Sequence, residues 1–163
     1  MPFVRPTLAV ALLLAGAARA DYLETARHEA AGQVVDELLD LAKWCVSTKL
    51  YRSRDQVYAL ILTFDADQPT ARRKLRYVRV KGGGWKRNRE MPETRDRLPA
   101  FHAELEQRRR AIGTRFGDAL VPLMEKAGTT RSLATRERVL REIFLLHPDH
   151  EGAHRANRAV QAG

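Results

Sequence analysis

The sequence predicts an all-α protein made of antiparallel helical hairpins. Apolar residues recur at spacings of three and four along most of the chain, which is the helical period. In addition, the segment Arg54–Val78 recurs 82 residues later as Arg136–Val160. Repetition of a helix–turn–helix unit is typical of helical-repeat proteins, which usually bind partners rather than catalyse reactions. We therefore expect stacked hairpins, with one long amphipathic helix between the two repeat copies.

The two copies align without a gap. The first contains ILTFDADQPTARRKLRYV and the second IFLLHPDHEGAHRANRAV. Apolar character is kept at Tyr58/Leu140, Leu62/Phe144 and Phe64/Leu146. Identical residues stand at Arg54/Arg136, Val57/Val139, Ile61/Ile143, Asp67/Asp149, Ala71/Ala153, Arg73/Arg155, Arg76/Arg158 and Val78/Val160.

Residues 1–20 have the pattern of a secretory signal peptide. Arg5 supplies a positive start, Thr7–Ala17 is almost wholly apolar, and Ala18-Arg19-Ala20 is an A-x-A cleavage site. We expect cleavage after Ala20 and an exported protein, periplasmic or secreted, whose residues 21–163 form a single helical domain. An anchor helix that stays uncleaved is the alternative.

Residues 21–81 are predicted to form the first helical unit. Its first helix runs from Tyr22 to about Thr48. Ser53 is expected to cap the second helix, because its hydroxyl can accept from free N–H groups of the first turn. Asp67 is expected to cap a third helix, Pro69–Val80, which buries Ala71, Leu75 and Val78 and is ended by the three glycines 82–84.

A basic loop (residues 82–93) and a long helix (residues 94–127) are predicted next. Trp85–Thr94 is polar and lacks periodicity, and Thr94 is a candidate cap for the long helix. Pro122 should kink or end that helix, since a proline ring removes a hydrogen bond and clashes with the preceding turn. The buried stripe of the helix is expected to be Leu98, Phe101, Leu105, Ile112, Phe116, Leu120 and Leu123.

Residues 131–163 hold the second repeat copy. Ser132 is expected to cap its first helix, the residues His147-Pro148-Asp149-His150 to form its turn, and Glu151–Gln161 its second helix. No segment is predicted as a strand. The residues 77–80 alternate in polarity, but they also continue a helical pattern.

An apolar helix, a short Asp/Pro turn and a helix that opens with a small residue resemble the junction between tetratricopeptide repeats. Pro148 stands at the family's proline, and Ala71 and Ala153 match its small residue. Arg76 and Arg158 depart from the pattern, because glycine is expected there. The alternative is an ordinary helical bundle whose hairpins share a turn by chance.

The resemblance implies a groove lined by the first helix of each repeat unit. Carried over to the Pro69–Val80 helix, it nominates Arg73, Tyr77 and Lys81, which share one face at a spacing of four. Trp85 either extends this binding site or packs back on the core. The resemblance therefore implies a protein or peptide partner.

The stretch from Arg72 to Arg89 is strongly basic in a chain of net charge +9. It contains no acidic residue, and Tyr77 and Trp85 are interleaved with the cations. Cations with aromatic rings suit nucleic-acid phosphates, anionic lipids or acidic glycans. Docking on an anionic envelope polymer, a lipid surface or nucleic acid is therefore the alternative function. A merely solvated arginine-rich face is the simplest interpretation.

The sequence holds no recognisable catalytic motif, and we predict that the protein is not an enzyme, needs no cofactor and takes no small-molecule substrate. His147, His150 and His154 have a spacing that suits a metal ion. The repeat copy carries Asp65, Gln68 and Arg72 at these places, so the turn does not require the histidines. We predict no metal site. Cys45 is the only cysteine and is expected to be a small buried residue.

Overall fold

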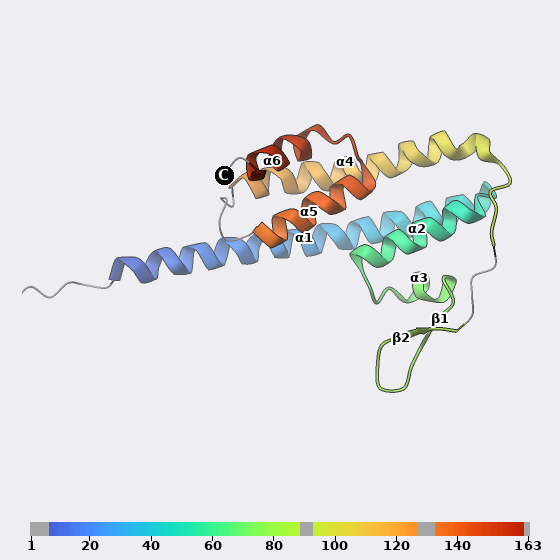
Figure 1. Cartoon of the computed structure of the whole chain (residues 1–163), viewed down its shortest axis with the longest axis horizontal. Coiled ribbons are helices and arrows are strands. Elements are labelled where there is room, and N and C mark those ends of the chain that lie inside the picture. Colours follow the sequence, from blue (N-terminus) through green and yellow to red (C-terminus); the bar gives the residue numbers. More distant parts are fainter. Residues whose placement is uncertain (1–6, 89–92, 127–132, 162–163) are drawn as a thin grey trace, which may run out of the picture. The chain divides into compact units, whose positions relative to one another are not determined.

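The computed structural model describes residues 7–88, 93–126 and 133–161, and this part of the chain is mainly helical (Figure 1). The prediction of a helical protein is confirmed in this general form. The elements are α1 (Thr7–Ser47), α2 (Tyr51–Phe64), α3 (Pro69–Lys74), β1 (Tyr77–Arg79), β2 (Trp85–Arg87), the 3-10 helix η1 (Pro99–Phe101), α4 (His102–Lys126), α5 (Leu133–Leu146) and α6 (Glu151–Gln161). None of the described helices is long and apolar enough to cross a membrane.

The internal contacts of the chain group its residues into two compact units. Unit 2 is the continuous segment Ala31–Ile112, and unit 1 combines Met1–Ala30 with Gly113–Gly163. The division passes through α1 and α4, each of which contributes residues to both units.

Unit 2 is built on the apolar faces of α1, α2 and α4. Most of the apolar residues expected inside are buried, and Leu38, Cys45 and Ile61 are fully inaccessible to solvent. Leu98, predicted as part of the buried stripe of the long helix, is instead 41% exposed and lies before that helix begins. Trp44 meets the edge of Phe101 with ring centroids 6.1 Å apart, so η1 is held against α1. The remaining buried apolar residues of the unit are Ala31, Val34, Val35, Leu41, Ala42, Leu50, Val57, Tyr58, Phe64, Ala71, Leu75, Leu105 and Ile112.

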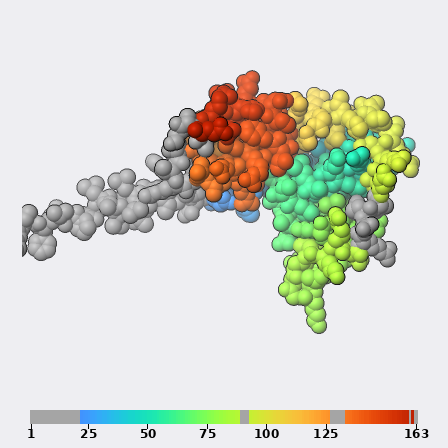
Figure 2. All heavy atoms as spheres, viewed as in Figure 1, coloured from blue at the N-terminus to red at the C-terminus, as the bar shows by residue number. Residues whose placement is uncertain are grey.

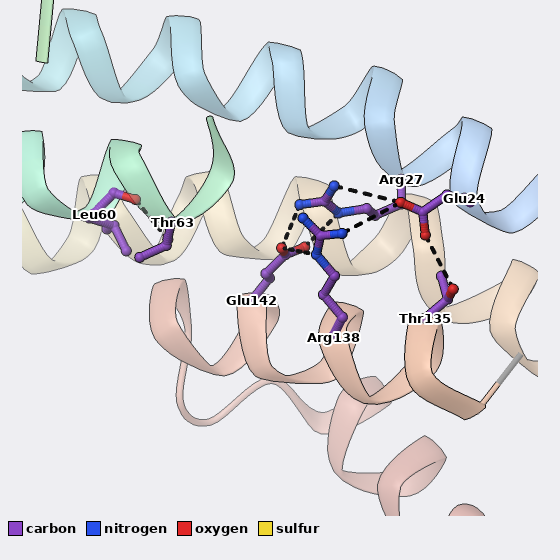
Figure 3. A network of polar contacts seen from close by, with 7 residues as sticks. All are labelled: Glu24, Arg27, Leu60, Thr63, Thr135, Arg138 and Glu142. Carbon is purple, nitrogen blue, oxygen red and sulfur yellow. Dashed lines mark hydrogen bonds and ion pairs between the residues drawn. The ribbon is translucent and has the colours of Figure 1, made fainter. Parts of the chain in front are cut away.

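Unit 1 encloses a buried ion pair beside its apolar core. Arg27 of α1 donates to Glu142 of α5 through Nε at 3.0 Å and through a terminal nitrogen at 2.5 Å, and both side chains are almost wholly buried (Figure 3). Arg138 also donates to Glu142 at 3.3 Å, and Glu24 accepts from Thr135. Losing one partner of such a buried pair would strand a charge, so the pair fixes how α5 meets α1 within the unit.

Two glycines of α4 let the turn after α5 approach closely. A Cβ atom added at Gly113 would lie 2.7 Å from the Cβ of His147, and one at Gly117 would lie against the ring of His150. Such distances are shorter than packed side chains tolerate. The glycines are therefore needed by packing within unit 1.

The helix α2 is capped differently from the prediction. It begins at Tyr51, and Ser53 lies inside its first turn. The cap is the Asp96 carboxylate, which accepts from the backbone N–H groups of Arg52 and Ser53 at 2.8 and 3.1 Å. A carboxylate near a helix N-terminus satisfies free donors and favours the helix dipole.

The long helix is shorter at its start than predicted. Thr94 does not cap it, because its hydroxyl donates to Asp55 at 2.9 Å, and α4 begins only at His102 after η1. Pro122 lies inside α4, which continues to Lys126 rather than ending at the proline. The predicted cap Ser132 lies outside the described residues.

The third predicted helix, Pro69–Val80, is wrong beyond Lys74. Its cap is Gln68 rather than Asp67, since the Gln68 side chain accepts from the Ala71 backbone N–H at 2.8 Å. The chain then leaves the helix, and residues 77–79 pair as a strand with residues 85–87. The residues predicted as a basic loop (82–93) therefore include β2, and the glycines 82–84 form a hairpin turn rather than a helix end.

Candidate functional site

The basic stretch forms a two-stranded antiparallel ribbon. The chain first leaves the helical conformation and then reverses direction in a hairpin turn. Arg76 adopts a positive φ of 62°, which ends the helical course, and Gly82, Gly83 and Gly84 all have positive φ values in the hairpin turn. The register pairs Tyr77 with Arg87, Val78 with Lys86 and Arg79 with Trp85. The backbone N–H of Asn88 donates to the Arg76 carbonyl at 2.9 Å and closes the base of the ribbon. We call Arg76–Asn88 the cationic ribbon; Figure 2 shows it as a narrow projection of unit 2.

One face of the ribbon combines aromatic rings with guanidinium groups. Alternation along the strands puts Tyr77, Arg79, Trp85 and Arg87 on this face. Arg79 lies 5.3 Å from the centroid of Trp85, and Arg87 lies 5.4 Å from that of Tyr77. Arg72 reaches over from α3, at 4.6 Å from Tyr77 and 5.8 Å from Trp85. Three guanidinium groups are thus held against two rings by cation–π attraction.

Two hydrogen bonds tie this face to the turn before α3. The Trp85 indole donates to the Asp67 carboxylate at 2.7 Å, and Arg72 Nε donates to the Ala66 carbonyl at 2.7 Å. These bonds limit the freedom of the ring and the guanidinium group. A ligand that contacts them therefore loses less conformational entropy than one that must order free arginines.

The opposite face, which we call the valine face, carries Arg76, Val78, Val80, Lys86 and Asn88. Val78 and Val80 are 42% and 38% exposed although both are apolar. A pocket of about 340 Å³ lies at the base of the ribbon, where the chain passes from α3 into β1. It is lined by Arg73, Arg76, Tyr77, Val78 and Asn88.

The ribbon's cations lack acidic partners within the described part of the chain. None of the arginines and lysines between residues 72 and 87 forms an ion pair there, whereas Arg108, Arg109 and Arg138 of α4 and α5 each pair with a glutamate of the same helix. Among the described residues, the positive charge of the ribbon is thus balanced by no ion pair.

The four residues predicted to bind a partner do not share a helical face. Arg73 lies on α3, Tyr77 on β1, Lys81 in the hairpin turn and Trp85 on β2. Arg73 and Tyr77 line one pocket, at the base of the ribbon. Trp85 lies on the aromatic face, where Arg72, Arg79 and Arg87, which were not nominated as site residues, complete the constellation. In the sequence, these three arginines were marked only by their place in the basic stretch that contains no acidic residue.

A second polar cluster, in unit 2, joins Ser53, Asp96 and His102. The Ser53 hydroxyl donates to Asp96 Oδ2 at 2.6 Å, and His102 Nε2 lies 2.9 Å from the same oxygen. Burial raises the pKa of the Asp96 carboxyl, but hydrogen bonds from Ser53, His102 and the Arg52 backbone outweigh it, so the net pKa lies below the ordinary value. The carboxylate stands between serine and histidine. Histidine is thus not placed to take the serine proton, and the cluster works as a helix cap.

The histidines of the second turn have separate structural roles. His150 Nδ1 accepts from the Ala153 backbone N–H at 3.2 Å, and His154 Nε2 bonds the Pro148 carbonyl at 2.8 Å. The His147 ring bonds Thr114 at 3.2 Å. Across the described residues, no three histidine, cysteine or acidic side chains gather as a metal site would require.

The lone cysteine is buried, as predicted. Cys45 is inaccessible to solvent, and burial raises the pKa of its thiol to about 11. The thiolate is the nucleophilic form of cysteine, so this side chain is poorly suited to covalent chemistry at neutral pH.

Comparison with known proteins finds no matching family model, no matching curated protein and no matching solved structure. The role of the ribbon is therefore inferred from its own geometry and charge.

Proposed function

We propose that the protein is a non-catalytic binding module whose cationic ribbon holds a polyanionic partner. The observation that carries this proposal is the aromatic face, where Arg72, Arg79 and Arg87 lie over Tyr77 and Trp85. Guanidinium groups match phosphate and carboxylate oxygens through paired N–H donors. A row of them that has no acidic partner among the described residues suits a chain of anions better than a single neutral ligand.

The proposal predicts a steep dependence of binding on salt. Each partner anion neutralised by a ribbon cation releases counterions, so the logarithm of the association constant falls with the logarithm of the salt concentration. Fluorescein-labelled polyphosphate, followed by fluorescence anisotropy at several salt concentrations, measures this slope. Replacing Arg79 and Arg87 by glutamine should lower the magnitude of the slope by about two.

The repeat supplies a matched control for this experiment. Arg155 and Arg158 are exposed arginines of α6 at repeat positions equivalent to Arg73 and Arg76. The change Arg155→Gln with Arg158→Gln removes the same charge and should leave the slope nearly unchanged. If both double variants weaken binding equally, attraction comes from net charge alone and the ribbon is not the site.

A second candidate function is a scaffold of tetratricopeptide-like hairpins that binds a protein or peptide. The supporting observation is a hollow of about 510 Å³ on α5 and α6, lined by Glu137, Leu140, Arg141, Phe144, Leu145 and Asn157. Leu145 is largely exposed there. An apolar hollow with a polar rim is the usual form of a peptide-binding groove.

Pull-down from an envelope extract, repeated with Leu145→Glu, tests this candidate. A partner captured through the hollow should be lost in the variant and retained in Arg79→Gln/Arg87→Gln. Retention by Leu145→Glu and loss from the ribbon variant would assign the partner to the ribbon.

We also propose that the protein is exported and processed after Ala20, on the basis of its N-terminal sequence. The helix α1 continues through this position, so processing would leave a helix that starts near Asp21. Intact mass spectrometry of the protein from its native host measures the first residue. Recovery of the full-length chain from the membrane fraction would contradict cleavage.

A further inference from the structure

The valine face differs from the aromatic face in what it leaves exposed. On the aromatic face the rings are covered by guanidinium groups. On the valine face, Val78 and Val80 stay in contact with water beside Lys86. A soluble polyanion attracts the cations but offers the valines no apolar surroundings.

The pocket at the base of the ribbon has residues that suit a phosphate. Arg73, Arg76 and Asn88 line it, and guanidinium and amide groups donate hydrogen bonds to phosphate oxygens. Val78 and Tyr77 form its apolar part. Arg76 lies in the chain between α3 and β1, and its backbone has a positive φ of 62°.

We propose that the valine face docks on a bilayer of anionic phospholipids, with a lipid phosphate bound in the pocket of Arg73 and Arg76. This inference rests on the proposed function, because it identifies the ribbon's polyanion as a lipid surface. The valines enter the boundary between headgroups and acyl chains, where apolar side chains are stabilised. Lys81 and Lys86 keep their ammonium groups at headgroup level while their aliphatic stems follow the valines.

The hairpin turn fits this placement. Gly82, Gly83 and Gly84 have no side chains that would hold the ribbon away from a flat surface. An added Cβ would meet nothing within 4 Å at any of the three. The glycines are thus required by their positive φ values and not by packing, and the end of the ribbon remains slim enough to reach between headgroups.

Co-sedimentation with vesicles tests the inference on the full chain. Vesicles of phosphatidylcholine alone report any contribution of the apolar N-terminal segment, because they carry no net charge. Vesicles that also contain phosphatidylglycerol should bind the protein more tightly. The change Arg73→Gln with Arg76→Gln should weaken this added binding by about 30-fold, as expected for two cations at an anionic surface. The control Arg155→Gln with Arg158→Gln should change it by less than about threefold.

The valines distinguish a bilayer from a soluble polyanion. Val78→Ser with Val80→Ser should weaken binding to the phosphatidylglycerol vesicles about tenfold and leave binding to soluble polyphosphate within about twofold. Circular dichroism and the fluorescence of Trp85 in a Trp44→Phe background establish that the ribbon is still formed.

Two results would overturn the inference. If the serine variant binds the vesicles as tightly as the wild-type chain, the valines do not enter the bilayer, and the partner is a soluble polyanion consistent with the proposed function. If the wild-type chain binds neither phosphatidylglycerol vesicles nor polyphosphate, the inference and the proposed function both fail.

Discussion

The hairpin α2–α3 and the hairpin α5–α6 have the same turn and different endings. In the first turn, Asp65, Gln68 and Arg72 donate through their backbone N–H groups to Ile61, Asp65 and Gln68. In the second, His147, His150 and His154 do the same to Ile143, His147 and His150.

The side chains of the two turns also correspond. Gln68 and His150 each accept from the N–H three residues later. Arg72 and His154 each contact the carbonyl six residues earlier. Different residues thus fill the same hydrogen-bonding roles, which means that the turn is preserved by geometry rather than by residue type.

The endings differ because the residues after the shared turn favour different backbones. The second copy continues with Ala156, Asn157 and Ala159, and α6 reaches Gln161. The first copy continues with Tyr77, Val78 and Val80, whose aromatic and β-branched side chains favour strands. The comparison shows that the shared turn determines where the helix after it begins, but not where that helix ends.

The prediction with the largest expected effect concerns the buried isoleucines of the two hairpins. It tests whether equivalent repeat positions contribute equally to the core. Ile61 and Ile143 occupy matching positions, and both are fully buried. Truncating either to alanine should lower the free energy of unfolding by about 2–5 kcal/mol, because the surrounding side chains close the cavity only in part. Urea denaturation followed by circular dichroism measures the loss. A loss below about 1 kcal/mol at both sites would show that the shared pattern does not carry the core.

The next effect concerns a contact described for the second hairpin. Gly117→Ala places a methyl group against the His150 ring and should lower the free energy of unfolding by about 1–3 kcal/mol. The matched control is Gly32→Ala in α1, where an added Cβ meets nothing within 4 Å. That change should stabilise by about 0.5–1 kcal/mol, since alanine is the better helix former. If Gly117→Ala and Gly32→Ala shift the melting temperature equally, the His150 ring moves aside without an energetic cost, and the prediction is wrong.

A smaller effect concerns the cap of the first hairpin and its dependence on pH. Asp96→Ala removes the acceptor of two N–H groups and should cost about 1–2 kcal/mol at neutral pH. The folded-state pKa of Asp96 is below the ordinary value of 3.8, so this stabilisation is present above that value and is lost as the pH falls through the folded-state pKa. The difference between wild type and variant in urea denaturation should therefore shrink below about pH 3.8. A difference that stays constant into acid would show that the carboxylate charge is not involved.

The smallest expected effect comes from changing an arginine to glycine at two equivalent repeat positions. The change should stabilise the structure at one position and destabilise it at the other. Arg76 has a positive φ, whereas the equivalent Arg158 lies in α6. Arg76→Gly should stabilise the base of the ribbon by up to about 1 kcal/mol, because glycine adopts this backbone without strain. Arg158→Gly should destabilise α6 by about 1 kcal/mol. Amide hydrogen exchange of the ribbon and of α6 measures each change, and the same sign at both positions would contradict the difference in backbone.

Sequence reasoning predicted most of the helices and most of their buried residues, because apolar spacing depends only on local order. Ile61, Ile143, Ala71 and Ala153 are buried as the repeat indicated. It missed the ribbon because a four-residue segment such as Tyr77–Val80 fits both periods, and Val78, expected inside, is exposed.

The composition of the candidate site could be predicted from the sequence, but its geometry could not. The acid-free basic stretch drew attention to the segment that forms the cationic ribbon, yet a helical spacing was used to choose Arg73, Tyr77 and Lys81. Cross-strand pairs such as Arg79 with Trp85 depend on a register that the helical interpretation did not consider. The Asp96 cap was also missed, because it lies 43 residues from Ser53 in the chain.

The buried pair of Arg27 and Glu142 has a consequence for the order in which the molecule is made. The two residues are 115 positions apart, so a chain emerging from the ribosome presents Arg27 long before its partner exists. Unit 2 is one continuous stretch and can complete its core while synthesis continues. Unit 1 must wait for α5, and contacts of such high sequence separation form slowly. Until then the part of α1 around Arg27 lacks the ion-pair partner that it has in the finished fold, so this stretch stays open to other contacts while the rest of the chain is made.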